Sequence, residues 1–245
     1  MGDCSYADAA VPVRQDLREA HARAFEGLAR AGTWWAGHER IAIAEEVRRA
    51  PACSLCAQRK QALSPLAVEG EHDAGAALPN AVVEVVHQVV NDPGRLSRTW
   101  FEKVLAAGMS NEQYVETIGV IVSLVSIDSF CLGIGVPPRP LPEPQPGEPS
   151  RVRPAGAVDG EAWVPWVPES RATGSESDLY DTPRTGNVLK ALSLVPDEVR
   201  QLKDLSQAHY LSPAQMMDLE AGRCLDRRQI ELVAGRVSAV RECFY

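Results

Sequence analysis

The chain has 245 residues, which corresponds to one or two domains of ordinary size. Its 33 acidic and 25 basic residues leave a net charge of −8, which argues against a nucleic-acid binder that relies on a basic stripe. Hydrophobic residues make up 45% of the chain, enough to build a core and to exclude wholesale disorder. Aromatic residues are few, and Ala, Val and Leu dominate, which favours helices.

Apolar residues recur at helical spacing through the first half of the chain. Ser110 and Gln113 have the spacing of a capping box, which marks the start of a long helix. No stretch alternates with period two, so we predict an all-α fold. The predicted helices of this half cover residues 14–31, 38–50, 53–63, 80–91, 98–107 and 110 to about 132.

The middle of the chain has a different composition. Residues 137–168 hold ten prolines and residues 169–185 are rich in Ser, Thr and Gly, a composition typical of an extended connector. Helices are predicted again over 187–195, 197–209, 213–220 and from about 226 onward. We therefore expect a helical domain over 12–136, a Pro-rich connector over 137–185 and a partial second helical repeat over 186–245.

The third segment repeats part of the first at an offset of 190 residues. Gly32 corresponds to Gly222 and Cys53 to Cys243 in this alignment. The second copy ends two residues after its cysteine, so we interpret the repeat as incomplete.

The first residues, MGDCSYADAAVPVRQD, contain neither the basic nor the apolar segment of a secretory signal. Residues 118–136 are long and apolar enough to resemble a membrane span, but they include Asp128 and lack a basic flank. We interpret them as a buried core helix. We expect a cytoplasmic protein, without membrane or nucleic-acid partners, whose thiols stay reduced.

The strongest chemical signal is the motif Cys53-Ser54-Leu55-Cys56, just after Pro51. Two cysteines three residues apart lie on the same face of a helix. Backbone amides and the helix dipole at a helix start favour thiolates, and Arg59 adds positive charge one turn later. A thiolate with a second thiol beside it is what peroxide reduction or disulfide exchange requires.

The motif has three other interpretations. A structural zinc site needs a second Cys/His pair, and the remaining cysteines are scattered singly, so we predict neither a metal site nor a cofactor. A thioredoxin-like motif needs a βαβ setting, which the pattern lacks. The two residues can also be an inert pair of small buried side chains.

The CxxC between helices, followed by NDPGRLSRTWFEKVLAAGMSNEQYVETIGVIVSLVSIDSF, resembles the AhpD-like / carboxymuconolactone decarboxylase superfamily over residues 25–136. The resemblance implies an AhpD-like helical bundle and disulfide-linked hydroperoxide reduction, with Cys56 as nucleophile and Cys53 as resolving thiol. It also implies a hydroperoxide substrate, a thiol or dithiol electron donor and a homo-oligomer, since family members assemble through their helices.

The family also has a glutamate twelve residues before its first cysteine and a histidine four residues after its second. This chain has Ile41 and Lys60 at those positions. Lys60 can hold a thiolate by charge, but it relays protons poorly unless its pKa is lowered. Among nearby glutamates we rank Glu39 ahead of Glu46.

Two histidines can replace the missing relay. His72 lies in an acidic loop, VEGEHDAG, and His87 lies on the apolar helix 80–91. Each also has an ordinary interpretation, as a solvated loop residue or as a core histidine. In the second copy, Glu231 and Cys243 keep the family spacing.

We therefore expect an enzyme of the alkylhydroperoxidase type. The competing hypothesis is a non-catalytic helical oligomerisation or binding module with a degenerate site, because the first copy lacks the family glutamate and histidine. Cofactor-free lactone or decarboxylase chemistry is a third possibility, and the presence of the CxxC counts against it.

Overall fold

The computed structural model describes residues 4–75, 77–160, 162–181 and 185–240. Within these ranges the protein is all-α, as predicted, and the only extended pairing is an isolated bridge between Val158 and Trp166. The α-helices are α1 (Gln15–Ala29), α2 (Gly37–Arg49), α3 (Ser54–Gln61), α4 (Asn80–Asn91), α5 (Arg98–Ala106), α6 (Asn111–Gly133), α7 (Asn187–Lys190), α8 (Pro196–His209), α9 (Pro213–Met217) and α10 (Arg227–Val240).

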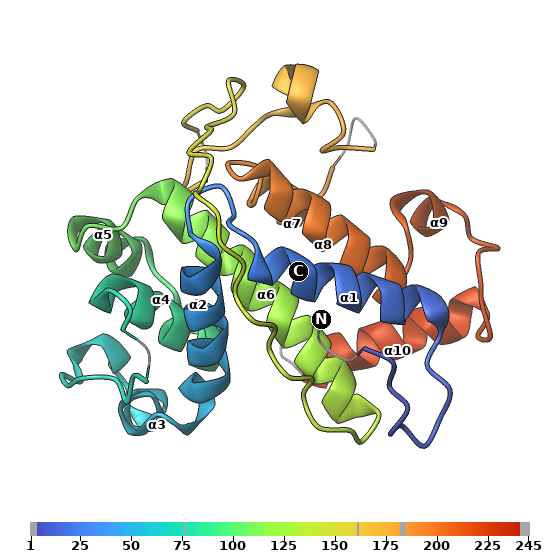
Figure 1. The fold of residues 1–245 in the computed structure, drawn as a ribbon, viewed down its shortest axis with the longest axis horizontal. Helices are drawn as coiled ribbons and strands as arrows, with labels where there is room; N and C mark the ends of the chain where they lie inside the picture. Colours follow the sequence, from blue (N-terminus) through green and yellow to red (C-terminus); the bar gives the residue numbers. More distant parts are fainter. Residues whose placement is uncertain (1–3, 76, 161, 182–184, 241–245) are drawn as a thin grey trace.

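The sequence signals for helix starts hold in the structure. Ser110 accepts a hydrogen bond from the amide of Gln113 at 3.1 Å, and the Gln113 side chain accepts one from the Ser110 amide at 3.0 Å. This capping box satisfies two amides that have no partner inside the helix. It begins α6, which occupies the centre of the molecule in Figure 1.

The central helix α6 has α2 and α4 on one side and α1 and α8 on the other (Figure 1). It is long and apolar enough to cross a membrane by length and composition, and 56% of its most apolar window is buried inside the protein. Leu124 and Ile127 on this helix are completely buried. The helix therefore supplies the middle of a single large hydrophobic core that also includes residues of α8.

A buried ion cluster joins α2, α6 and α8. Arg40 on α2 contacts the carboxylate of Glu116 on α6 and, at 2.8 Å, that of Glu198 on α8. Gly119 makes room for this contact, because a Cβ built there would lie 2.1 Å from Glu198 Oε2. A glycine at this point of α6 is what allows the carboxylate of α8 to reach Arg40.

The described part of the connector has no α-helix, only two short 3₁₀ turns, Glu169–Arg171 and Gly174–Glu176, and its first half is hydrogen-bonded to the helical part of the chain. The Gln145 amide donates to the Ala29 carbonyl and the Arg151 amide donates to the Thr33 carbonyl, both at 2.8 Å. The connector therefore follows the loop between α1 and α2 before the chain reaches α8.

The last helix, α10, starts at Arg227, and α2 starts at Gly37, so the two starts are separated by the offset of the sequence repeat. Their packing differs. Ile43 and Val47 of α2 are buried, whereas their counterparts in α10, Val233 and Val237, are 54% and 57% exposed.

Candidate active site

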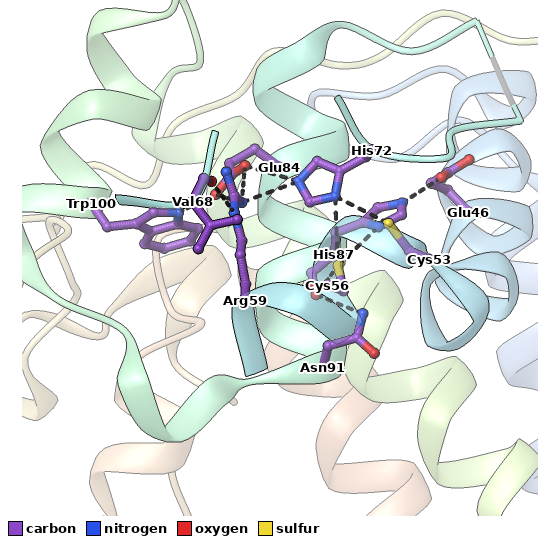
Figure 2. Close-up of polar contacts among 10 residues, drawn as sticks. All are labelled: Glu46, Cys53, Cys56, Arg59, Val68, His72, Glu84, His87, Asn91 and Trp100. Atoms are coloured by element: carbon purple, nitrogen blue, oxygen red, sulfur yellow. Dashed lines mark hydrogen bonds and ion pairs between the residues drawn. The ribbon is translucent and has the colours of Figure 1, made fainter. Parts of the chain in front are cut away.

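The two cysteines of the CxxC stand at the start of α3. Pro51 lies in a short 3₁₀ turn, Ala50–Ala52, and Cys53 follows it as the N-cap residue of α3 in an extended conformation. Cys56 is then one turn into the helix, on the same side. Figure 2 shows the two sulfurs close together, facing two imidazole rings.

The first imidazole comes from the loop before α4. His72 Nδ1 lies 3.5 Å from Cys53 Sγ and 3.5 Å from Cys56 Sγ. The carboxylate of its neighbour Asp73 accepts a hydrogen bond from the Ser54 amide at 2.7 Å. The loop is thus attached to the first turn of α3, and this attachment brings His72 over the sulfurs.

The second imidazole comes from α4 itself. His87 Nδ1 lies 3.4 Å from Cys56 Sγ, and the ring is completely buried. The centroids of the His72 and His87 rings are 4.2 Å apart. We call Cys53, Cys56, His72 and His87 the Cys/His cluster.

Each imidazole is held from behind by a carboxylate. His87 Nε2 lies 2.6 Å from Glu46 Oε1, and His72 Nε2 lies 2.9 Å from Glu84 Oε2. A carboxylate at Nε2 fixes the proton there and leaves Nδ1 directed at the sulfur. Both histidines therefore have the same orientation, with a carboxylate on one nitrogen and thiol sulfur on the other (Figure 2).

The two carboxylates are themselves fixed. Glu84 also accepts hydrogen bonds from Arg59 at 3.0 Å and from Trp100 Nε1 at 2.8 Å. Glu46, on α2, accepts one from the Gly75 amide at 3.0 Å. These bonds connect the site to α2, α3, α4 and α5.

The surroundings favour thiolates. Burial raises the pKa of the Cys53 thiol, but hydrogen bonds from the backbone amides of Asp73 and Cys56 and from His72 outweigh it and lower that pKa to about 6. Burial likewise raises the pKa of Cys56, and its hydrogen bonds with His72 and His87 lower it below the ordinary value. Cys53 can therefore carry negative charge at neutral pH, and the pKa of Cys56 shifts in the same direction.

The pKa values of the two imidazoles are raised, and the pKa of Glu84 is lowered. Burial lowers the pKa of His72, but its hydrogen bonds with Cys56, Glu84 and Cys53 raise it to about 10. Burial raises the pKa of Glu84, and its bonds with His72, Trp100 and Arg59 lower it to about 2. The pKa of His87 is also raised, because its bonds with Cys56 and Glu46 outweigh burial. The site thus combines thiols and a carboxylate of lowered pKa with two imidazoles of raised pKa.

Access to the sulfurs is restricted. Cys53 is 2% exposed and Cys56 is 7% exposed. Although buried, the sulfurs are not enclosed by hydrocarbon alone, since each lies within reach of a histidine. Any substrate that reaches them must be small or must displace the His72 loop.

Four of the sequence candidates meet in the Cys/His cluster. Glu39, ranked first among the glutamates, accepts a hydrogen bond from the Ala36 amide at 2.8 Å and caps its own helix. Glu46 is the glutamate that reaches the site, because it lies two turns further along α2, next to α4.

Two further candidates within the described residues, Lys60 and Glu231, are not part of the cluster. Lys60 is exposed, and its carbonyl accepts a hydrogen bond from Arg95 at 3.1 Å. Glu231 is exposed on α10, where it pairs with Arg227 at 2.7 Å and accepts from the Tyr210 hydroxyl at 2.6 Å. Cys243 lies outside the described residues.

Sequence reasoning missed Glu84 and Trp100 as parts of the site. Glu84 had a detectable signal, because it is the acidic residue in the otherwise apolar helix Asn80–Asn91 and stands three residues before His87. Trp100 had none, since its role depends on how α5 folds back on the site.

No family model, curated protein or solved structure matches this chain. The resemblance to the AhpD-like superfamily therefore stays a prediction. The site can be interpreted only from its own geometry.

Proposed function

We propose that Cys53 and Cys56 form a dithiol redox centre that reduces small hydroperoxides. The observation that carries the proposal is the continuous contact from Glu46 through His87 to Cys56, with distances of 2.6 Å and 3.4 Å. A carboxylate, an imidazole and a nucleophile in this order form a proton relay of the kind that activates cysteine. The low pKa of the thiols supports the same assignment.

The chemistry follows from the positions of the groups. The Cys56 thiolate attacks the terminal peroxide oxygen, the O–O bond breaks, and His87 gives a proton to the leaving alkoxide, so that the products are Cys56 sulfenic acid and an alcohol. The Cys53 thiolate then attacks the sulfenic sulfur, and with one proton this forms the disulfide and water. An external dithiol restores both thiols by exchange and becomes a disulfide itself.

The burial of the sulfurs supports selection by size. Hydrogen peroxide needs little room, whereas a bulky organic peroxide must displace the loop that carries His72. We therefore propose small hydroperoxides as the preferred substrates. The reducing cytoplasm is the setting in which dithiol donors are plentiful.

The test is peroxide consumption by the full chain after treatment with a chelator and a reductant. We expect Cys56→Ser to abolish turnover, while Cys53→Ser accumulates a sulfenic acid that dimedone labels. Cys224→Ser, which changes an exposed cysteine, serves as the matched control. Turnover by Cys56→Ser at the parental rate contradicts the proposal.

A second candidate function, a helical assembly module, is supported by α10. Val233, Val237 and Val240 lie on one face of this helix and are 54%, 57% and 61% exposed. An exposed apolar stripe of this kind is typical of a surface that binds another protein. We propose a second copy of this chain as the partner, and light scattering of the wild type against Val237→Lys tests it. An unchanged mass of a single chain in both would contradict this role.

A further inference from the structure

The Cys/His cluster holds one more imidazole than a proton relay needs. His87 alone can exchange a proton with Cys56, yet His72 also directs Nδ1 at both sulfurs. Two sulfurs and two imidazole nitrogens therefore converge, and these four atoms all lie within 4.8 Å of one another. The second Cys/His pair that the cysteine spacing did not offer comes from the two histidines.

The spacing of these atoms fits a tetrahedral metal ion. Zn²⁺ bound at 2.3 Å from sulfur and about 2.05 Å from nitrogen separates neighbouring ligand atoms by about 3.6 Å. Three of the four sulfur–nitrogen pairs of the cluster are 3.4, 3.5 and 3.5 Å apart, and all four atoms lie within 4.8 Å of one another. These three distances match the spacing that a bound zinc ion requires to within a few tenths of an ångström.

The carboxylates behind the imidazoles fit the same interpretation. Metal-binding histidines usually donate the hydrogen of the other ring nitrogen to a carboxylate, which fixes the tautomer and the ring orientation. Glu46 and Glu84 take this position at His87 and His72, at 2.6 and 2.9 Å. A relay through His87 accounts for Glu46 but gives no role to Glu84.

The packing of α3 gives an independent reason for a metal. Cys53, Leu55 and Cys56 form a small hydrophobic cluster with Val68 that is separate from the main core. So little buried apolar surface stabilises a helix weakly, and small segments of this kind are commonly held by a metal or a disulfide. A metal bound by Cys53, Cys56 and His87 would cross-link α3 to α4.

We propose that the reduced Cys/His cluster binds one Zn²⁺ through Cys53 Sγ, Cys56 Sγ, His72 Nδ1 and His87 Nδ1. Two thiolates and two imidazoles are a ligand set that selects zinc over magnesium or calcium. Four protein ligands close the coordination sphere, so the ion stabilises α3 and the His72 loop rather than activating water. This inference does not rest on the proposed peroxide chemistry, but both use the same sulfurs, so the zinc-loaded chain does not reduce peroxide.

The experiment adds Co²⁺ and then Zn²⁺ to the full chain, previously stripped of metal and kept reduced. We expect one Co²⁺ per chain, with the intense visible absorption of tetrahedral cobalt and a thiolate charge-transfer band, both removed by one equivalent of Zn²⁺. His72→Asn and Cys53→Ser should lose the spectrum, and Glu84→Gln should bind 10–100-fold more weakly. His38→Asn and Cys224→Ser, both at exposed positions, are the matched controls.

A second measurement on the unaltered chain guards against variants that fail to fold. Zn²⁺ should protect Cys53 and Cys56 from iodoacetamide and leave Cys224 reactive, as read by mass spectrometry of the peptides. Absence of both the cobalt spectrum and the protection overturns the metal site, whatever the peroxide assay gives. Zinc binding without peroxide turnover in the metal-free chain supports the site and instead overturns the proposed redox function.

Discussion

His87 lies between an acid and a thiol: its Nε2 is 2.6 Å from Glu46 and its Nδ1 is 3.4 Å from Cys56. If this contact transfers protons, Glu46→Gln should lower peroxide turnover of the metal-free chain by roughly 10²–10⁴-fold, the usual contribution of a general acid–base. Stopped-flow peroxide consumption measures it. Glu45→Gln, at the exposed neighbouring position, is the matched control and should keep the parental rate. Equal rates in the two variants would refute the relay.

The second prediction concerns the ionisation of the thiols. Because its pKa is lowered to about 6, Cys53 of the metal-free protein should react with iodoacetamide at a nearly constant rate from pH 8 down to pH 7. It should lose this reactivity below pH 6. His72→Asn removes one hydrogen-bond partner and should move the Cys53 transition upward. A Cys53 transition near the ordinary thiol value of about 8.5 would contradict the prediction.

Much of the fold could be predicted because its signals are local. The helix over residues 80–91 was predicted with the bounds that α4 has, since the apolar periodicity and the Asp92-Pro93 turn both act within a few residues. The capping box at Ser110 marked the start of α6 for the same reason. Helix propensity and capping depend on residues that are adjacent in sequence, and both agree with the way the helices pack in the folded protein.

The site was predictable only in part. The Cys53–Cys56 pair is a local motif, and His72 and His87 were singled out by residue type. Their convergence depends on α4 packing beside α3 and on Asp73 reaching the Ser54 amide, which are contacts between segments distant in sequence. The choice of Glu39 over Glu46 shows the same limit. Both residues lie on one face of α2, about two turns apart, and residue spacing along α2 does not reveal at which level of the helix α4 packs.

The third prediction tests the buried ion cluster of Arg40, Glu116 and Glu198. Arg40 is the cation that holds two buried carboxylates, so its removal leaves uncompensated buried charge, which typically costs about 3–5 kcal/mol. We therefore expect Arg40→Met to lower the free energy of unfolding, measured by urea denaturation, by that amount. Asp204→Asn on α8 breaks an exposed pair with Arg23 and should cost at most about 1 kcal/mol. Similar losses in the two variants would show that the cluster does not hold α8 onto α2 and α6.

The last prediction concerns a second histidine pair, between α1 and α8. His21 Nε2 lies 2.6 Å from His209 Nε2. The other ring nitrogen, His21 Nδ1, is hydrogen-bonded to the Tyr6 hydroxyl, also at 2.6 Å. Burial, and then the neighbouring His209, lower the pKa of His21 to about 4. Burial, and then the charge of Arg14, lower that of His209 as well.

A lowered histidine pKa makes the unfolded state bind more protons just below pH 6.5. The contribution of this pair to the free energy of unfolding is therefore fully present above that pH. It is lost as the pH falls, by up to about 1.4 kcal/mol per pH unit for each histidine. Urea denaturation between pH 7 and pH 5, with chelator present, measures the slope and stays above the range in which Glu84 titrates. We expect His209→Leu to reduce the slope and His38→Asn, at an exposed position, to keep it. A wild-type protein whose stability does not change over this range would show that the pair is not held neutral in the folded state.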